Sequence, residues 1–93
     1  MINETKIDSQ IAELGRLGDK VVELYGMSQT MQKSGGDLSL YAGINAILLD
    51  TTTKFHNYWR ELKSMSMSED DRERIKRVTK NTDDRIKRMK QVG

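Results

Sequence analysis

The segment Lys33-Ser34-Gly35-Gly36-Asp37 separates two long segments that have helical periodicity. Gly35 or Gly36 can adopt the left-handed conformation that ends a helix, and Asp37 or Ser39 can cap the helix that follows. The chain has no proline, so the commonest helix breaker is missing on both sides of this segment. The sequence therefore predicts a turn over residues 33–37 between two antiparallel helices.

The residues before the turn predict a helix over about 5–32. Its apolar residues recur at spacings of three, four and seven, which places them on one side of an α-helix. This apolar side covers roughly half of the helix surface. Gly18 falls near the centre of this face, and close approach by a facing helix is one explanation for it. The alternative is a helix that bends or breaks near Gly26, since each internal glycine costs about 1 kcal/mol relative to alanine.

The residues after the turn predict two further helices. The first runs over about 38–65, because its apolar stripe keeps the same phase on both sides of a run of three threonines. A Ser-Met linker follows over 64–68 and is a weaker boundary signal than the glycine turn. Ser68 is suited to cap a strongly charged last helix over about 69–91. The apolar stripe of this last helix is narrow and is diluted by threonine.

The widths of the three apolar stripes predict that one copy leaves apolar surface uncovered. The first two helices have broad apolar faces, and a narrow third helix cannot cover both of them. Small soluble domains rarely expose large apolar patches. We therefore expect residues 1–93 to form a single all-α domain, an antiparallel helical hairpin plus a third C-terminal helix. The arrangement is a three-helix bundle or coiled-coil-like, and it is completed by oligomerisation.

The sequence lacks the residue patterns of common catalytic and metal sites. It contains no cysteine and only one histidine, His56, so a zinc site would need carboxylates or a second copy of the chain. His56 has no nucleophile one helical turn away, where Thr52 and Arg60 stand. We expect no enzymatic activity, no cofactor, no metal and no small-molecule substrate. The absence of cysteine, of a signal pattern and of a long apolar run predicts a cytoplasmic protein without a membrane segment.

One stripe of the second predicted helix holds most of the aromatic residues and predicts a protein interface. The stripe consists of Tyr41, Ile44, Leu48, Phe55, Tyr58, Trp59 and Leu62. Phe55 and Trp59, four residues apart, suit the core of a bundle, whereas Tyr58, Trp59 and Arg60 are of types enriched in binding hot spots. Both interpretations hold if the bundle forms between chains. We therefore expect a small interaction module (an adaptor, assembly factor or inhibitor) that acts as a homo-oligomer or bound to a partner protein.

Charge is distributed unevenly along the chain. The net charge is −2 over residues 1–37, +1 over 38–67 and +3 over 68–93, which gives the total of +2. An acidic first helix and a basic last helix predict that the two pair within or between chains, or that the last helix contacts an anionic partner.

The second possibility defines an alternative function, that of a small regulator that binds nucleic acid through its last helix. The candidate contacts are Arg74, Arg77, Arg85 and Arg88. Acids stand four residues before several bases of the same helix, as in Asp70–Arg74 and Asp84–Arg88, and this order favours a self-neutralised, solvated helix instead. A site shared between subunits and built from His56, Tyr58 and Arg60 is a third alternative.

Overall fold

The computed structural model describes the backbone of residues 2–92 and the side chains of residues 6–91. Over this range the chain forms three helices, α1 (Ile2–Ser34), α2 (Leu38–Ser64) and α3 (Glu69–Val92), joined by two short connections. The prediction of an all-α fold is thereby confirmed. Each helix begins and ends within three residues of the bounds expected from the sequence.

The connection between α1 and α2 combines two capping motifs. Gly35 takes the left-handed conformation, with φ of 67°, and the amide of Gly36 donates to the carbonyl of Met31 at 3.3 Å. This hydrogen bond closes the last turn of α1 in the manner of a Schellman motif. Asp37 then caps α2, because its side chain accepts a hydrogen bond from the amide of Ser39 at 2.9 Å.

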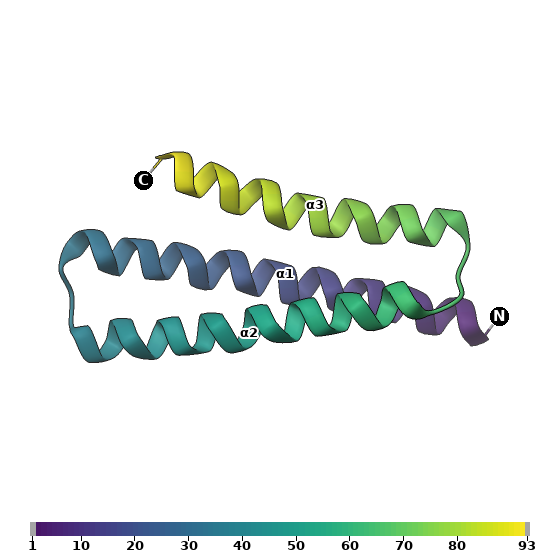
Figure 1. The fold of residues 1–93 in the computed structure, drawn as a ribbon, viewed down its shortest axis with the longest axis horizontal. Helices are drawn as coiled ribbons and strands as arrows, with labels where there is room; N and C mark the ends of the chain where they lie inside the picture. Colours follow the sequence, from purple (N-terminus) through teal and green to yellow (C-terminus); the bar gives the residue numbers. More distant parts are fainter. Residues whose placement is uncertain (1, 93) are drawn as a thin grey trace.

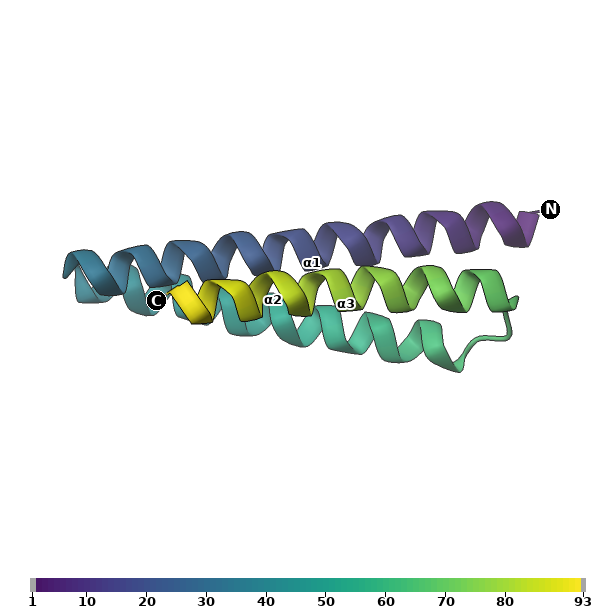
Figure 2. The ribbon, with the colours of Figure 1, turned by 90° about the horizontal axis from the view of Figure 1, so that it is seen from above.

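Helix α1 is the central helix of the bundle. It packs against both α2 and α3, whereas α2 and α3 contact each other little. Helix α2 runs antiparallel to α1, and α3 returns in the direction of α1 (Figures 1 and 2). The resulting body is elongated, 51 × 24 × 17 Å. In both views α3 ends short of the α1–α2 turn, so that end of the hairpin lacks a third helix.

Close approach of the three helices explains the central glycine of α1. The helix is continuous through Gly18 and Gly26, so no break occurs near Gly26. A Cβ atom built on Gly18 would overlap Oγ1 of Thr82 from α3, and it would lie 3.2 Å from Cε1 of Phe55 from α2. Gly18 therefore marks the level at which all three helices meet.

The hydrophobic core occupies only the half of the bundle remote from the α1–α2 turn. Its buried members are Ile11, Leu14, Val21, Phe55, Leu62 and Ile75. Between Val22 and Thr51 the only buried residue is Ser28, which is polar. Helix α3 adds few apolar side chains to this core and contributes buried threonines instead, among them Thr82. Residues 23–50 on both sides of the turn thus bury no hydrophobic side chain completely, although Leu48 is half-buried and packs against the core.

Candidate protein-interaction surface

Residues 24–49, which we call the tip segment, form the last turns of α1, the connection and the first turns of α2. The chain has 30 charged residues, 16 basic and 14 acidic, and only Lys33 and Asp37 lie in the tip segment. The other charged residues are spread densely over both flanks, beginning with Glu23 on one side and Asp50 on the other. The tip segment therefore contributes little charge of its own, although Arg88 and Lys90 of α3 lie beside its α1 part.

The same segment contains the exposed apolar side chains of the described structure. Among residues 6–91, the large hydrophobic side chains that are mostly open to solvent are exposed by 45% to 81%. They are Met27, Leu38, Leu40, Ile47 and Leu49. All of them lie in the tip segment, whose only charged residues are Lys33 and Asp37. Exposed apolar residues gathered in one segment of a small domain make it a candidate contact surface.

Helix α2 presents a continuous exposed face in this region, which we call the tip face. It consists of Leu38, Leu40, Ala42, Gly43, Ala46, Ile47 and Leu49, all of them exposed. At 100° per residue, the large side chains fall on two flanks and the small residues lie between them. A Cβ atom built on Gly43 would have no atom of the chain within 4 Å. The large side chains therefore lie on nearly opposite sides of α2, Leu38 and Leu49 on one side and Leu40 and Ile47 on the other, with small residues between them.

A single polar contact fixes the two helices of the tip segment against each other. The hydroxyl of Ser28 on α1 donates to Oδ1 of Asn45 on α2 at 2.7 Å. Ser28 is buried and Asn45 is half-buried, so loss of either partner would leave a polar group without a hydrogen bond. This hydrogen bond therefore adds a specific polar contact between α1 and α2 at a level where the apolar side chains, such as Ile44, are only half-buried.

The structure divides the residues of the interface predicted from the sequence into two groups. Phe55 and Leu62 lie in the core of the chain itself, because they occupy the centre of the side of α2 that faces α1. They are not available to a partner. The other five predicted interface residues are half-buried: Tyr41, Ile44, Leu48, Tyr58 and Trp59.

The most exposed residues of the candidate surface were not among those predicted from the sequence. The predicted stripe follows the inner side of α2, whereas Leu38 and Leu49, for example, lie on its outer side. A signal for them is present in the sequence. The interval between Glu23 and Asp50 contains two charged residues, and a solvent-facing helix of this length normally carries many more.

Trp59 lines a separate groove between α2 and α3. The groove encloses about 420 Å³, and Met67 and Ile75 form part of its apolar wall. The ammonium group of Lys63 lies 4.9 Å from the centre of the Trp59 ring, which is a cation–π arrangement. Charged side chains of both helices line the rest of the groove, so it is more polar than the tip face.

The three residues considered for a site shared between subunits do not converge within one chain. His56 lies beside the Trp59 ring, at 6.1 Å between ring centres, and is itself exposed. Tyr58 is on the other flank of α2, where it feels the charges of Glu13 and Arg16 from α1. Each of the three stands two positions from the next, a spacing that directs consecutive members to different sides of the helix.

The pKa of the Tyr58 phenol is raised above the ordinary tyrosine value. Partial burial is the main factor that raises the pKa of its phenol, Glu13 and Glu61 raise it further, and Arg16 opposes them. Because the folded state favours the neutral phenol, stability is greatest below the ordinary tyrosine pKa and falls as alkaline pH ionises the group. Ultraviolet titration should show a component that Tyr58→Phe removes and Glu13→Gln moves to lower pH. An unchanged titration in Glu13→Gln would contradict this assignment.

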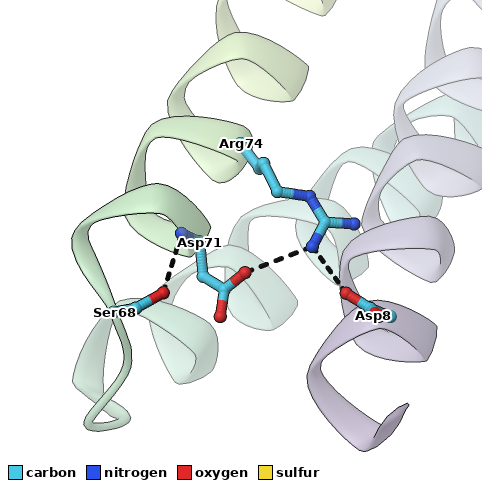
Figure 3. A network of polar contacts seen from close by, with 4 residues as sticks. All are labelled: Asp8, Ser68, Asp71 and Arg74. Carbon is cyan, nitrogen blue, oxygen red and sulfur yellow. Dashed lines mark hydrogen bonds and ion pairs between the residues drawn. The ribbon is translucent and has the colours of Figure 1, made fainter. Parts of the chain in front are cut away.

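Two of the four candidate arginines are paired with acids of α1. Nη1 of Arg74 donates to Asp8 at 2.5 Å and to Asp71 at 3.1 Å, beside the capping hydrogen bond from the amide of Asp71 to Oγ of Ser68 (Figure 3). The hydrogen bond to Asp8 is the main factor that raises the pKa of Arg74. Eleven residues further along both helices, a second arginine repeats the contact with an acid of α1.

That second contact joins Arg85 to Asp19 at 2.7 Å. The two contacts show that the acidic first helix and the basic last helix pair within one chain. Among residues 6–91, the acids and bases of α3 spaced by four residues do not come within 4.0 Å of each other. Exposed pairs of this type contribute little free energy, so their main effect is to orient α3 along α1. Arg77 and Arg88 remain exposed on α3.

The described residues contain neither a metal-binding group nor a membrane-spanning helix. No group of three or more acidic or histidine side chains within them converges in a way that could hold a metal ion. None of the three helices carries an apolar stretch of the length and hydrophobicity needed to cross a membrane. Comparison of the chain with protein-family models, with curated protein sequences and with solved structures gives no match.

Proposed function

We propose that this protein is a non-enzymatic protein-interaction module whose contact surface is the tip face of α2. The proposal rests on the observation that the buried core and the exposed apolar side chains lie in different parts of the bundle. The tip segment buries no hydrophobic side chain, yet it holds the large apolar side chains that the described structure exposes. A partner that covers this end would add apolar contacts to the side chains that the chain leaves exposed.

The exposed apolar area is large enough to drive association. The exposed fractions of the five large side chains amount to about three whole aliphatic side chains. Full burial of one such side chain is worth about 1.5–3 kcal/mol, so a partner that covers all five gains about 5–9 kcal/mol. Association costs at least about 4 kcal/mol in lost freedom of motion. The surface therefore supports binding, provided that the partner contributes apolar area of its own.

The alternative function, nucleic-acid binding through α3, has less support. Two of its four candidate arginines are held by Asp8 and Asp19, so a phosphate would have to compete with an existing partner. Such a phosphate would also remove contacts that orient α3 along α1. Arg77 and Arg88 are exposed together with further bases of α3, but the exposed acids Glu73 and Asp83 lie among them and interrupt the positive charge of this helix.

Affinity capture from the source cells, with a tagged chain as bait, tests the proposal. Ile47→Lys places a charge in the tip face at a position that is 54% exposed, so the fold should persist while binding is lost. Asn57→Lys is the matched control, because it adds the same charge to an exposed position of α2 outside the tip segment. We expect mass spectrometry to find a protein that the wild type and the control retain and Ile47→Lys loses. Equal recovery by all three baits would contradict the proposal.

A further inference from the structure

We infer that α3 is a releasable helix, which leaves the bundle as one unit while α1 and α2 stay packed against each other. Release uncovers the side of α1 that lies under α3, including Ile11, which is 5% exposed and lines a shallow hollow with Val78 of α3. The open state therefore presents apolar surface that the closed state hides. The inference goes beyond the proposed function and does not depend on it, because it concerns α3 and not the tip face.

Helix α3 is attached through less buried apolar surface than the two helices of the hairpin share. Leu14 of α1 and Phe55 and Leu62 of α2 belong to the core, each at 3% exposure or less. Among residues 6–91, α3 buries one hydrophobic side chain, that of Ile75. Burial of apolar surface is the dominant favourable contribution to helix packing. Separation of α3 from the hairpin therefore costs less than separation of α1 from α2.

Two inner positions of α3 are occupied by threonines whose hydroxyl groups bond within α3 itself. Thr79 and Thr82 are 7% and 3% exposed. The hydroxyl of Thr79 donates to the carbonyl of Ile75 at 3.1 Å, and that of Thr82 donates to the carbonyl of Val78 at 3.2 Å. Both hydrogen bonds move with the helix, so release breaks no hydrogen bond at these positions.

Glycines of α1 lie under two levels of α3. A Cβ atom built on Gly18 would overlap the hydroxyl of Thr82, and one built on Gly26 would lie 2.9 Å from Cε of Met89. At both levels α1 contributes backbone and no side chain to the contact. Dispersion energy grows with the number of atoms in contact, so α3 approaches α1 closely there but gains little from it.

The polar contacts between α1 and α3 lie near the surface. The side chains of the two ion pairs described above are exposed by 39% to 68%, and exposed pairs contribute little free energy and are screened by salt. Nε2 of Gln29 donates to the carbonyl of Met89 at 3.3 Å, which is long for a hydrogen bond. The connection between Ser64 and Glu69 keeps a released α3 near the hairpin, so that release is reversible.

Hydrogen exchange of the wild-type chain at increasing urea concentration, followed by mass spectrometry, is the first test. We expect the amides of residues 74–86 in α3 to exchange at least about tenfold faster than those of residues 8–22 and 51–63 in the hairpin. Their exchange should also depend less steeply on urea, because release of one helix exposes less surface than global unfolding. Equal rates with equal urea dependence in the three helices would show that the bundle opens only as a whole and would overturn the inference.

Thr79→Val tests whether the polar inner side of α3 is the cause. Valine keeps the shape and has a similar helix propensity, but it places an apolar methyl group in the buried position. We expect exchange of α3 to slow by about fourfold, the factor that corresponds to one buried methyl-sized group. Thr53→Val is the matched control, because Thr53 is exposed on α2 and donates in the same way to the carbonyl of Leu49 at 2.9 Å. An equal effect of both substitutions on α3, or no effect of Thr79→Val, would overturn the inference.

A disulfide between α1 and α3 tests the movement directly. The chain has no cysteine, and a Cβ atom at Gly18 would lie 3.5 Å from Cβ of Thr82, a separation that a disulfide spans. In the double variant Gly18→Cys/Thr82→Cys, we expect oxidation to bring exchange of the amides on either side of residue 82 to the rate of the hairpin and reduction to restore their faster exchange. Exchange of α3 ahead of the hairpin with the disulfide intact would contradict release as a unit. The wild-type measurement decides the question even where this variant does not fold.

Discussion

Replacement of Leu14 by alanine is expected to lower the free energy of unfolding by about 2–5 kcal/mol, the range for large-to-small substitutions in a core. Leu14 has 0% of its surface exposed and lies in the core on the central helix. Because only half of the bundle has a hydrophobic core, few other contacts can compensate for the cavity. Small domains are stable by about 5–15 kcal/mol, so we expect much of the total stability to be lost.

Met27→Ala is the control for this substitution. Met27 lies on the same helix in the tip segment, is 45% exposed and is outside the tip face. Surface substitutions usually change stability by about 0.5 kcal/mol or less. Urea denaturation followed by circular dichroism measures both variants against the wild type. Similar losses in Leu14→Ala and Met27→Ala would show that the core does not lie in the half of the bundle described above.

Replacement of Gly18 by alanine is expected to destabilise the protein although alanine is the better helix former. The new methyl group would overlap the hydroxyl of Thr82, which is buried and donates to the carbonyl of Val78 at 3.2 Å. Overpacking of this kind costs about 1–3 kcal/mol, and the gain in helix propensity of about 1 kcal/mol offsets only part of it. We expect a net loss of up to about 2 kcal/mol, which lowers Tm by up to roughly 16 °C in a domain of this size.

Gly15→Ala separates helix propensity from packing. A Cβ atom at Gly15 would have no neighbouring atom within 4 Å, so this variant receives the propensity gain without the overlap. We expect its Tm to rise by a few degrees while that of Gly18→Ala falls. A rise of equal size in both variants would contradict the close approach of α3 at Gly18. Thermal unfolding at one fixed protein concentration makes the two values comparable.

Local sequence patterns were sufficient to predict the helices and their connections. The glycine pair and Asp37 marked the first turn, and Ser68 marked the start of α3, because capping depends on residues only a few positions apart. The partners of the charged residues could not be predicted in the same way. Arg74 stands four residues after an acid of its own helix, yet it contacts Asp8 of α1. That contact depends on how α3 is placed along α1, which a local spacing does not encode.

The residues of the tip face were not predicted, for a related reason. An apolar stripe shows which side of a helix is buried, and it placed Phe55 and Leu62 correctly on the inner side of α2. It does not show which apolar residues on the outer side lack a neighbour. Leu49 is exposed because it lies on this outer side, which α1 does not cover and which α3 contacts little.

The parallel course of α3 along α1 imposes an order on the assembly of the chain. The contacts of Asp8 with Arg74 and of Asp19 with Arg85 each join residues 66 positions apart, whereas α1 and α2 are joined by a turn of three residues. Closing a short loop costs less chain entropy than closing a long one. Once the hairpin exists, only a four-residue connection separates its end from α3. We therefore expect a newly made chain to form the α1–α2 hairpin first and to pack the basic helix α3 onto the completed hairpin last.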